Sequence, residues 1–201
     1  MCYRTQINSK PIDIKKRFNV EIEFPVLEFP QGEINGFSHP LLPVISDRSP
    51  QQLSMMEWGI IPHWAKDKKL QVNTLNCMIE TAEDKPSFKY AAGNRCLVIA
   101  DGFFEWKHEK INGKLVKQKH LITVPGGGLF AMAGIYNHWN GLDTFTILTT
   151  VANELMADIH NTKKRMPVIL CPEEEAFWLK KEPLHLYHSR AEVDLVAVPL
   201  T

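Results

Sequence analysis

The chain has 201 residues, which is enough to bury one substantial core and too few for two average domains, so we expect a single domain over residues 1–201. Its 23 basic and 23 acidic side chains balance, so the protein has no net positive charge to attract it to a polyanion such as DNA. Any nucleic-acid site must therefore be a local basic patch. No apolar run approaches the ~20 residues of a membrane span, and no secretory signal follows Met1, so we expect a soluble, cytoplasmic protein.

The predicted elements become clear in the middle of the chain. Residues 72–81 favour neither strand nor loop, whereas residues Pro86 to Ala92 are predicted to form a short helix that stops at Gly93. Alternating apolar runs with Asn-Gly and Gly-rich turns between them then predict antiparallel strands. These strands run from Arg95 to Trp106, from Leu115 to Val124 after an Ile111-Asn112-Gly113 turn, from Leu129 to Trp139 and from Thr144 to Val151.

Two further helices are predicted near the C-terminus. Asn153 is suited to cap a helix from Glu154 to His160, and Pro172 is suited to open one from Glu173 to Leu179. Strands at Met166 to Leu170 and Val193 to Leu200 complete the pattern. Because short turns join most strands, we predict an α+β fold with a mainly antiparallel, mixed β-sheet, a barrel-like core and a few short helices.

Cys2 is the first candidate for chemistry, because removal of Met1 would place a free α-amine and a thiol on one residue. Such a 1,2-aminothiol captures an aldehyde as an imine and then closes a five-membered thiazolidine through sulfur. The amine titrates near ~8 and a free thiol near ~8.5, so we expect neither group to need much activation. A small buried side chain is the alternative role for a cysteine.

The other cysteines, Cys77, Cys96 and Cys171, lie far apart and form no Cys-x-x-Cys pair. This spacing is typical of free thiols in a reducing compartment. His185 and His188 lack the companions with ligand spacing that a zinc site requires, so we expect no metal and no cofactor.

Glu105 and His160 are candidates for proton transfer. On a strand, Glu105 shares a face with Phe103, whereas Phe104 and Trp106 take the other face. A carboxylate beside apolar rings loses hydration, which raises its pKa, although a glutamate at a strand edge that reaches water is the alternative. His160 ends a predicted helix whose dipole would favour the protonated imidazole, unless the ring simply caps the terminal carbonyls.

Several polar side chains could contact a sugar or a phosphate. The Asn76 amide could donate to a sugar hydroxyl, or it could bond its own backbone. The run Lys163-Lys164-Arg165 could hold phosphates, although short basic runs on surfaces are usually just solvated. Trp58, Trp64 and Trp106 could stack on an unpaired base, with core packing as their default role.

The residues discussed above belong to a series of motifs that follow one another between Cys2 and about Leu170. They are Met1-Cys2-x-Arg4, Trp58-Gly59-Ile60-Ile61-Pro62-x-Trp64-Ala65, Asn76 before Glu80-Thr81, Lys85-Pro86-Ser87-Phe88, Arg95-Cys96-Leu97-Val98, Asp101-Gly102-Phe103-Phe104-Glu105-Trp106, and His160 with Arg165-Met166-Pro167. Together they resemble the SRAP family of abasic-site processing proteins.

The resemblance implies a DNA-damage response protein that removes its own Met1 and crosslinks covalently, through Cys2, to the ring-opened aldehyde of an abasic site in single-stranded DNA. Such a protein would be cytoplasmic and would join the nucleoid on DNA, with weak strand-cleaving lyase activity from β-elimination of the imine. Site roles carry over residue by residue. Cys2 is implied as the crosslinking aminothiol, Asn76 as a sugar-binding amide, Glu105 as the proton-transfer carboxylate, His160 as its partner, Arg4 and Arg165 as phosphate ligands, and Trp106 as a side chain that packs beside the DNA.

The chain departs from the family pattern at three places. Tyr3 replaces the usual glycine after the cysteine, Met78 stands where an arginine generally follows Asn76 by two residues, and extra residues separate His160 from Arg165. We expect Lys163 and Lys164, in the extra segment, to replace the missing phosphate contact, because a lysine can act as a point-charge phosphate ligand.

Two alternative functions remain open from the sequence. One is a peptidase or amidohydrolase that uses the same N-terminal nucleophile, and the other is a noncovalent single-strand-binding module in which Cys2 is incidental. A hydrolase needs an oxyanion site, which the sequence does not locate, and a pure binder needs a broader basic surface than a neutral chain provides.

Overall fold

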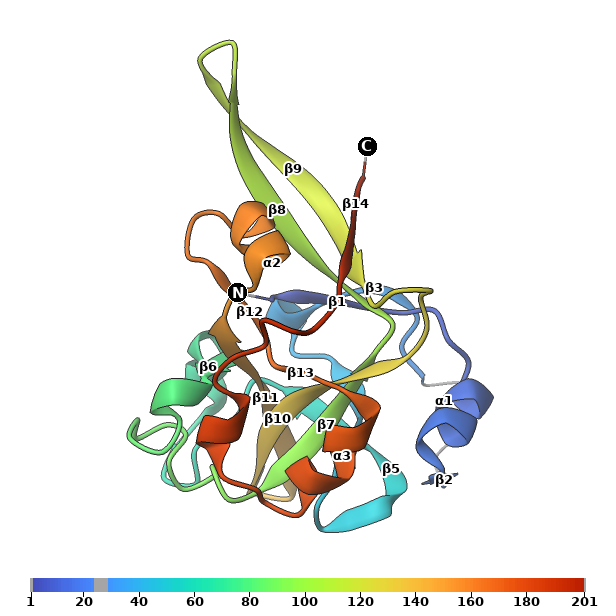
Figure 1. The fold of residues 1–201 in the computed structure, drawn as a ribbon. Coiled ribbons are helices and arrows are strands. Elements are labelled where there is room, and N and C mark those ends of the chain that lie inside the picture. The colour runs from blue at the N-terminus through green and yellow to red at the C-terminus, as the bar shows by residue number, and fades with distance from the viewer. Residues whose placement is uncertain (1, 24–28, 201) are drawn as a thin grey trace.

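The computed structural model describes residues 2–23 and 29–200, so Met1 lies outside the described residues. Within them the strands form two sheets in a mixed α+β arrangement (Figure 1). The smaller sheet has the order β14-β9-β8-β1-β3, from strands Val196–Pro199, Lys114–Thr123, Gly102–Ile111, Arg4–Ile7 and Gly32–Asn35. All of its pairings are antiparallel.

The larger sheet contains most of the core. Its order is β12-β11-β10-β7-β4-β5-β2, from strands Arg165–Pro167, Leu142–Val151, Phe130–Trp139, Arg95–Ala100, Leu41–Ser46, Ser49–Trp58 and Glu21–Ile22. Two short strands pair beside this path, β6 (Asn76–Met78) with β11 and β13 (Ile169–Leu170) with β10. Because β11 also pairs with β5, the path through β10, β7 and β4 returns to its start and the sheet is partly ring-like. This agrees with the predicted α+β class and its mainly antiparallel pairing.

Burial on both faces explains why the central strands carry continuous apolar runs. Every residue of β7 is buried, and so are the first seven of β10. Trp58, at the end of β5, is fully buried, stacks on Phe145 with ring centroids 6.3 Å apart and donates from its indole nitrogen to the Leu75 carbonyl over 2.8 Å. Trp58 is therefore a core residue and not a surface for stacking bases.

The helices are short and cover the sheets. They are α1 (Pro11–Phe18), α2 (Glu154–Ile159) and α3 (Pro172–Leu179), with 3-10 turns at Gly36–Ser38, Lys68–Asn73, Ile79–Thr81 and Leu184–Tyr187. The predicted cap is present, since Asn153 accepts a hydrogen bond from the Met156 amide over 2.9 Å, and Pro172 opens α3 as expected. None of the helices in the described part of the chain has the length and apolar character to cross a membrane.

Several predicted elements differ in the structure. Residues 86–92 form successive turns and not a helix: the Ala91 and Asn94 amides each bond a carbonyl only three residues back, and so short an isolated helix has little stability. The strand predicted from Met166 to Leu170 divides at Val168 into β12 and β13, which pair with different partners. The last strand is β14, shorter than predicted. The strands before residue 72 had no clear sequence signal.

The strand predicted from Arg95 to Trp106 is also divided, at Asp101. Here the chain leaves the larger sheet as β7 and enters the smaller sheet as β8. A hydrophobic pattern cannot show this change of sheet, because both halves remain buried as far as Glu105. The break has a structural role, because Asp101 binds the N-terminal segment of the chain.

Candidate functional site around Cys2

Asp101 and Gly102 fix the start of the chain against β8. One Asp101 carboxylate oxygen accepts from the backbone amides of Asn8 and Ser9 over 2.6 and 2.7 Å, and the other lies 3.3 Å from the Gln6 amide nitrogen. Gly102 allows the close approach, because a Cβ there would lie 2.8 Å from the Leu121 side chain and 3.3 Å from the Gln6 side chain. These contacts hold β1 beside β8, and Cys2 lies two residues before β1.

Cys2 is fully buried, and its backbone is held from the larger sheet. The side-chain amide of Asn76, at the start of β6, donates to the Cys2 carbonyl over 2.8 Å. The Asn76 oxygen is buried and has no hydrogen-bond partner among the described residues, so the amide retains an unused acceptor. The structure thus brings together Cys2 and Asn76, which are 74 positions apart in the sequence.

The Cys2 thiol is not readily ionised, contrary to our expectation from its position in the sequence. Burial raises the pKa of Cys2 far above its ordinary value, and the negative charge of Glu105 raises it further. The group is therefore a thiol at neutral pH, and a base must take its proton when it attacks. The Glu105 charge therefore acts on the Cys2 thiol.

Glu105 and His160 belong to the same buried cluster. Both are largely shielded from solvent, at 5% and 7% exposed. Burial lowers the pKa of His160, and the Glu105 charge partly opposes this shift. The pKa of His160 therefore shifts in the direction opposite to the expected protonated imidazole, because burial of the ring outweighs the Glu105 charge that favours that form. The ring nitrogen Nδ1 lies 2.8 Å from the Arg165 carbonyl, and not on the carbonyls at the end of α2.

Asn161 joins the segment after α2 to the edge of β8. Its side chain accepts from the His108 amide over 3.2 Å and donates to the His108 carbonyl over 2.8 Å. Because β1 pairs with β8 only at Gly102 and Phe103, the edge from Glu105 onward is left for this contact. The segment that follows His160 is therefore bound to β8 three residues beyond Glu105.

A pocket of about 390 Å³ opens at this edge of β8. Its lining joins the cluster to residues of the surrounding strands and of the extra segment, namely Tyr3, Glu105, Trp106, His108, Lys117, His160 and Thr162. Tyr3, where the family pattern has glycine, forms part of the wall and packs on Phe37 with ring centroids 4.9 Å apart. The pocket therefore combines a carboxylate, an imidazole and aromatic walls next to Cys2.

Cations surround Trp106 on its own face of β8. Arg4 and Lys119 lie over the indole ring at 5.9 and 5.7 Å, and both form ion pairs with Glu33. The two hydrogen bonds lower the pKa of Glu33 in spite of the opposing effect of burial. Glu33 was not anticipated from the sequence, and it fixes both cations beside the pocket.

The Arg165 side chain is already paired within the protein, whereas the side chains of Lys163 and Lys164 are exposed. The Arg165 guanidinium bonds both Glu80 oxygens, over 3.0 and 2.7 Å, and the Thr149 carbonyl over 2.6 Å. A phosphate would have to replace Glu80 to reach this group. The two lysines form no ion pair within the described residues, and the Lys163 charge is close enough to lower the pKa of His160.

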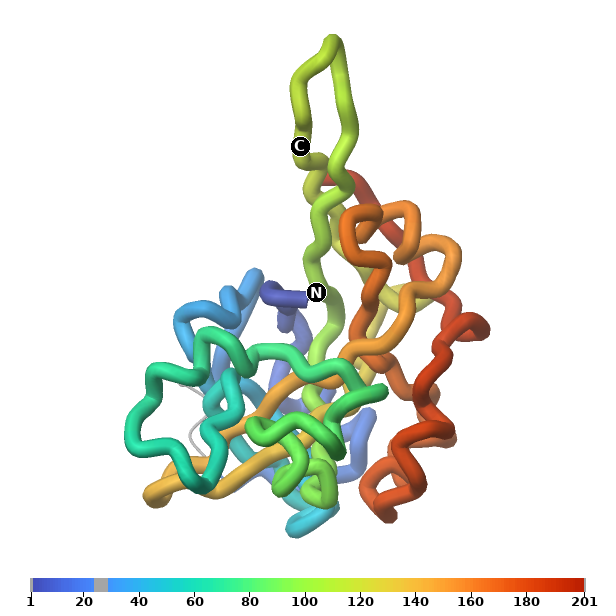
Figure 2. The backbone as a smooth tube through the Cα atoms, turned by 90° about the vertical axis from the view of Figure 1, so that its left-hand side faces the viewer, coloured from blue at the N-terminus to red at the C-terminus, as the bar shows by residue number. Residues whose placement is uncertain are grey.

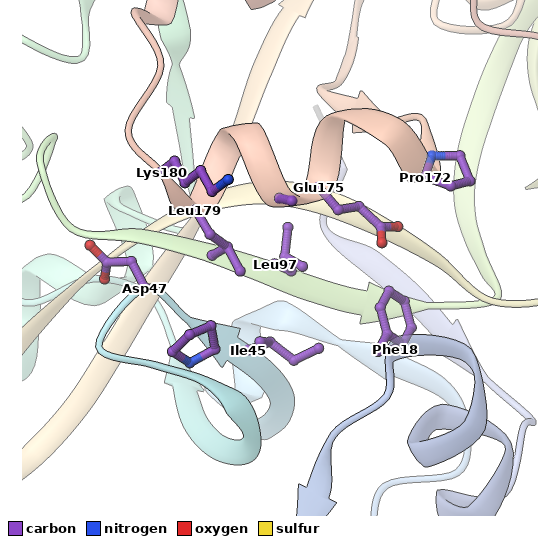
Figure 3. A pocket seen from close by; sticks show the side chains of 10 residues that line it. Phe18, Ile45, Asp47, Leu97, Pro172, Glu175, Leu179 and Lys180 are labelled. Atoms are coloured by element: carbon purple, nitrogen blue, oxygen red, sulfur yellow. The ribbon is translucent and has the colours of Figure 1, made fainter.

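A second pocket, of about 430 Å³, lies between α1, α3, β4 and β7 (Figure 3). Its walls are mainly apolar, and its two carboxylates are already paired, Asp47 with Lys181 over 2.8 Å and Glu175 with Arg17 over 2.6 Å. None of its lining residues lies on the elements around Cys2. All four cysteines are free, as predicted, and among the described residues no group of three or more His, Cys, Asp or Glu side chains could hold a metal ion.

The fold and the site define an α+β protein with a buried cysteine at position 2, a candidate nucleophile, next to Tyr3 in the wall of a pocket that a carboxylate and an imidazole also line. The chain belongs to the family described as SOS response associated peptidase (SRAP), whose model matches residues 1–198. This confirms the resemblance seen in the sequence motifs.

Relatives and solved structures agree with this assignment. The abasic site processing protein YoqW of Bacillus subtilis is 40% identical over 185 residues, which cover 89% of this chain and 80% of that protein. The abasic site processing protein HMCES of Pongo abelii is 32% identical over 195 residues, which cover 76% of this chain and 54% of that protein. A crystal structure of a protein from Bacteroides thetaiotaomicron, 30% identical, matches with a TM-score of 0.87 over 100% of this chain and 92% of the other.

Proposed function

We propose that this protein processes abasic sites in single-stranded DNA by forming a covalent link through Cys2. The relatives named for abasic-site processing support the substrate. The observation that carries the reaction is the cluster itself: a buried thiol at position 2, with Asn76 on its backbone and the Glu105 charge acting on both Cys2 and His160.

The reaction begins once hydrolysis of the Met1–Cys2 peptide bond has freed the Cys2 α-amine. Opening of the deoxyribose ring breaks the C1′–O4′ bond, with a proton delivered to O4′ and one removed from the 1′-hydroxyl. The amine then adds to the aldehyde and water leaves, giving an imine. Addition of the thiol across the C=N bond forms the C–S bond, moves the thiol proton to nitrogen and closes the thiazolidine.

Proton movement in these steps falls to Glu105 and His160. Each step needs a group that gives or takes a proton near the aldehyde, and the thiol needs a base because its pKa is raised. In the tautomer in which Nδ1 donates to the Arg165 carbonyl, rather than accepting from the Arg165 amide, neutral His160 would present Nε2 as a proton acceptor. The unused Asn76 oxygen would accept a hydrogen bond from a sugar hydroxyl.

The DNA strand would pass over the basic residues around the pocket. Arg4 and Trp106 would contact it on one side, and Lys163 and Lys164 on the other, with Arg165 as a phosphate ligand only where the phosphate displaces Glu80. Loss of a C2′ proton from the imine, with departure of the 3′-phosphate, would give weak lyase activity. This chemistry would act in the cytoplasm and at the nucleoid.

Intact-mass measurement and denaturing electrophoresis test the proposal. We expect the mature protein to lack Met1 and to form a denaturant-resistant adduct with an abasic single strand, but not with an intact strand of the same sequence. Binding without an adduct would favour the noncovalent module. Hydrolysis of peptides or amides without an adduct would favour the N-terminal-nucleophile hydrolase. Crosslinking by protein that retains Met1 would refute the thiazolidine chemistry.

A further inference from the structure

The β8–β9 hairpin extends well beyond the body of the molecule (Figures 1 and 2). It also carries an excess of positive charge. Residues 107–119 contain five lysines and one glutamate, a net charge of +4 in a chain whose total is +0. Two of the lysines are neutralised locally, Lys107 by Asp158 and Lys119 by Glu33. The other three, Lys110, Lys114 and Lys117, are exposed and form no ion pair within the described part of the chain.

The strand register sorts the unpaired lysines onto two faces. His108 lies opposite Lys117 and Trp106 opposite Lys119, so these four side chains share a face, and Lys110 follows on it two residues after His108. Lys114 lies opposite Ile111, which belongs to the face of Glu105. One face of the hairpin therefore carries the Trp106 ring, then His108 with the unpaired Lys117 opposite it, and then the unpaired Lys110.

This face is continuous with the pocket beside Cys2. Trp106, His108 and Lys117 line the pocket directly. Lys110 lies four residues beyond Trp106, about 13 Å along the strand at ~3.3 Å per residue. That length matches about four nucleotides of a stacked strand at ~3.4 Å each.

The base of the hairpin is held on both sides. β14 pairs with β9 along Val196–Pro199, the Gln118 amide donates to the Leu200 carbonyl over 2.7 Å, and Asn161 bonds His108 on the edge of β8. The face is thus fixed in direction where it leaves the pocket, which lowers the entropy lost when a strand binds to it.

We infer that this face of the hairpin is an extension of the nucleic-acid site, in which His108, Lys110 and Lys117 contact the backbone of about four nucleotides beyond the abasic residue. The inference rests on the proposed function and extends it to residues outside the reacting cluster. An aromatic ring followed by cations is the arrangement that binds single strands without reading their sequence. A neutral protein can gain DNA affinity this way because its charges are concentrated where the strand passes.

The test compares lysine-to-glutamine variants on the two faces, with binding to an intact single strand measured over a range of salt concentrations. Each lost phosphate contact lowers the slope of log affinity against log salt by ~0.7, so K110Q/K117Q should lower it by ~1.4. K117Q should lower it by ~0.7, whereas K114Q removes the same charge from the other face and should leave it unchanged. On strands too short to reach Lys110, the deficit of K110Q/K117Q should fall to that of K117Q alone, because Lys117 lines the pocket.

Two outcomes would overturn the inference. One is an unchanged slope in K110Q/K117Q, and the other is an equal loss in K114Q and K117Q, which would show a general charge effect. Thermal unfolding midpoints equal to the parent exclude misfolding. Crosslinking by the parent protein separates this inference from the proposed function: if the parent binds with the predicted face dependence but forms no adduct, the covalent proposal fails and the hairpin surface stands.

Discussion

Replacement of Glu105 by glutamine separates a proton-transfer role from an electrostatic one, because the structure gives these roles opposite signs. The Glu105 charge raises the pKa of the Cys2 thiol, so its removal alone makes the thiol easier to ionise and should speed sulfur attack. The same charge raises the pKa of His160, so its removal makes that imidazole a weaker base. Loss of a proton-transfer carboxylate should slow every step that moves a proton.

We expect Glu105→Gln to slow adduct formation by ~10²–10⁴-fold at saturating protein, equivalent to about 3–5 kcal/mol of activation free energy. Glu105 is only 5% exposed, so bulk water is poorly placed to substitute for it. Binding to an intact single strand should change little, because glutamine keeps the volume. Single-turnover crosslinking on denaturing gels, beside an affinity measurement, gives both quantities.

The pH profile provides a second readout of the same change. Burial lowers the pKa of His160, so the ring is neutral at pH 7 and the parent rate should fall as the pH drops through that lowered pKa. In Glu105→Gln this fall should move to lower pH, because the supporting negative charge is absent. Glu109→Gln is the matched control, since Glu109 lies on β8 outside the pocket and pairs with Lys107 over 3.5 Å. A rate increase in Glu105→Gln would refute proton transfer by Glu105.

Three further changes test other parts of the site. Cys2→Ser should abolish the stable adduct on denaturing gels, because a hydroxyl is a poorer ring-closing nucleophile than a thiol. The control Cys77→Ser, which changes another buried thiol, should retain the adduct. An equal adduct from Cys2→Ser would assign the reaction to another residue. Lys163→Ala/Lys164→Ala should lower the salt slope of single-strand binding by up to ~1.4, and an unchanged slope would exclude the proposed replacement of the arginine absent at Met78. Glu80→Gln should lower the free energy of unfolding by ~1–2 kcal/mol in denaturant titrations at pH 7, because the ion pair with Arg165 is only partly exposed. Burial acts to raise the pKa of Glu80, but its hydrogen bonds, mainly to Arg165, lower the pKa overall. The stabilisation is therefore present above the unfolded pKa near ~4.3 and is lost as the pH falls through the folded pKa. Equal acid sensitivity of the variant and the parent would contradict this account.

The predictable parts of this protein are those with local signals. The turn at Asn112-Gly113 and the alternation on either side of it mark the β8–β9 hairpin, and both residues have the positive φ angles that this turn needs. The cap at Asn153 and the proline that opens α3 are equally local. The first strands carry no such marks, because β4 and β5 owe their stability to pairing within the larger sheet.

The sequence predicted which residues belong to the candidate site, but it did not predict how they are arranged. The motifs named Cys2, Asn76, Glu105 and His160, yet nothing local shows that Asn76 bonds the Cys2 carbonyl or that Glu80 occupies Arg165. The ionisation states were also out of reach, because burial determines the pKa shifts of Cys2 and His160. Glu33 gave no signal, and Asp101 stood in one of the ordered motifs without a role of its own.

The contacts of Asp101 restrain the segment that follows Cys2, as the proposed reaction requires. Chain termini are usually mobile, because few contacts restrain them. Here the amides of Asn8 and Ser9 bond a carboxylate that directly precedes β8, the strand that carries Glu105. Nucleophile and carboxylate therefore share one anchor, and a shift of β8 moves both together. In the proposed reaction, this shared anchor would hold Cys2 and Glu105 in place relative to each other, although they lie about a hundred residues apart in the sequence.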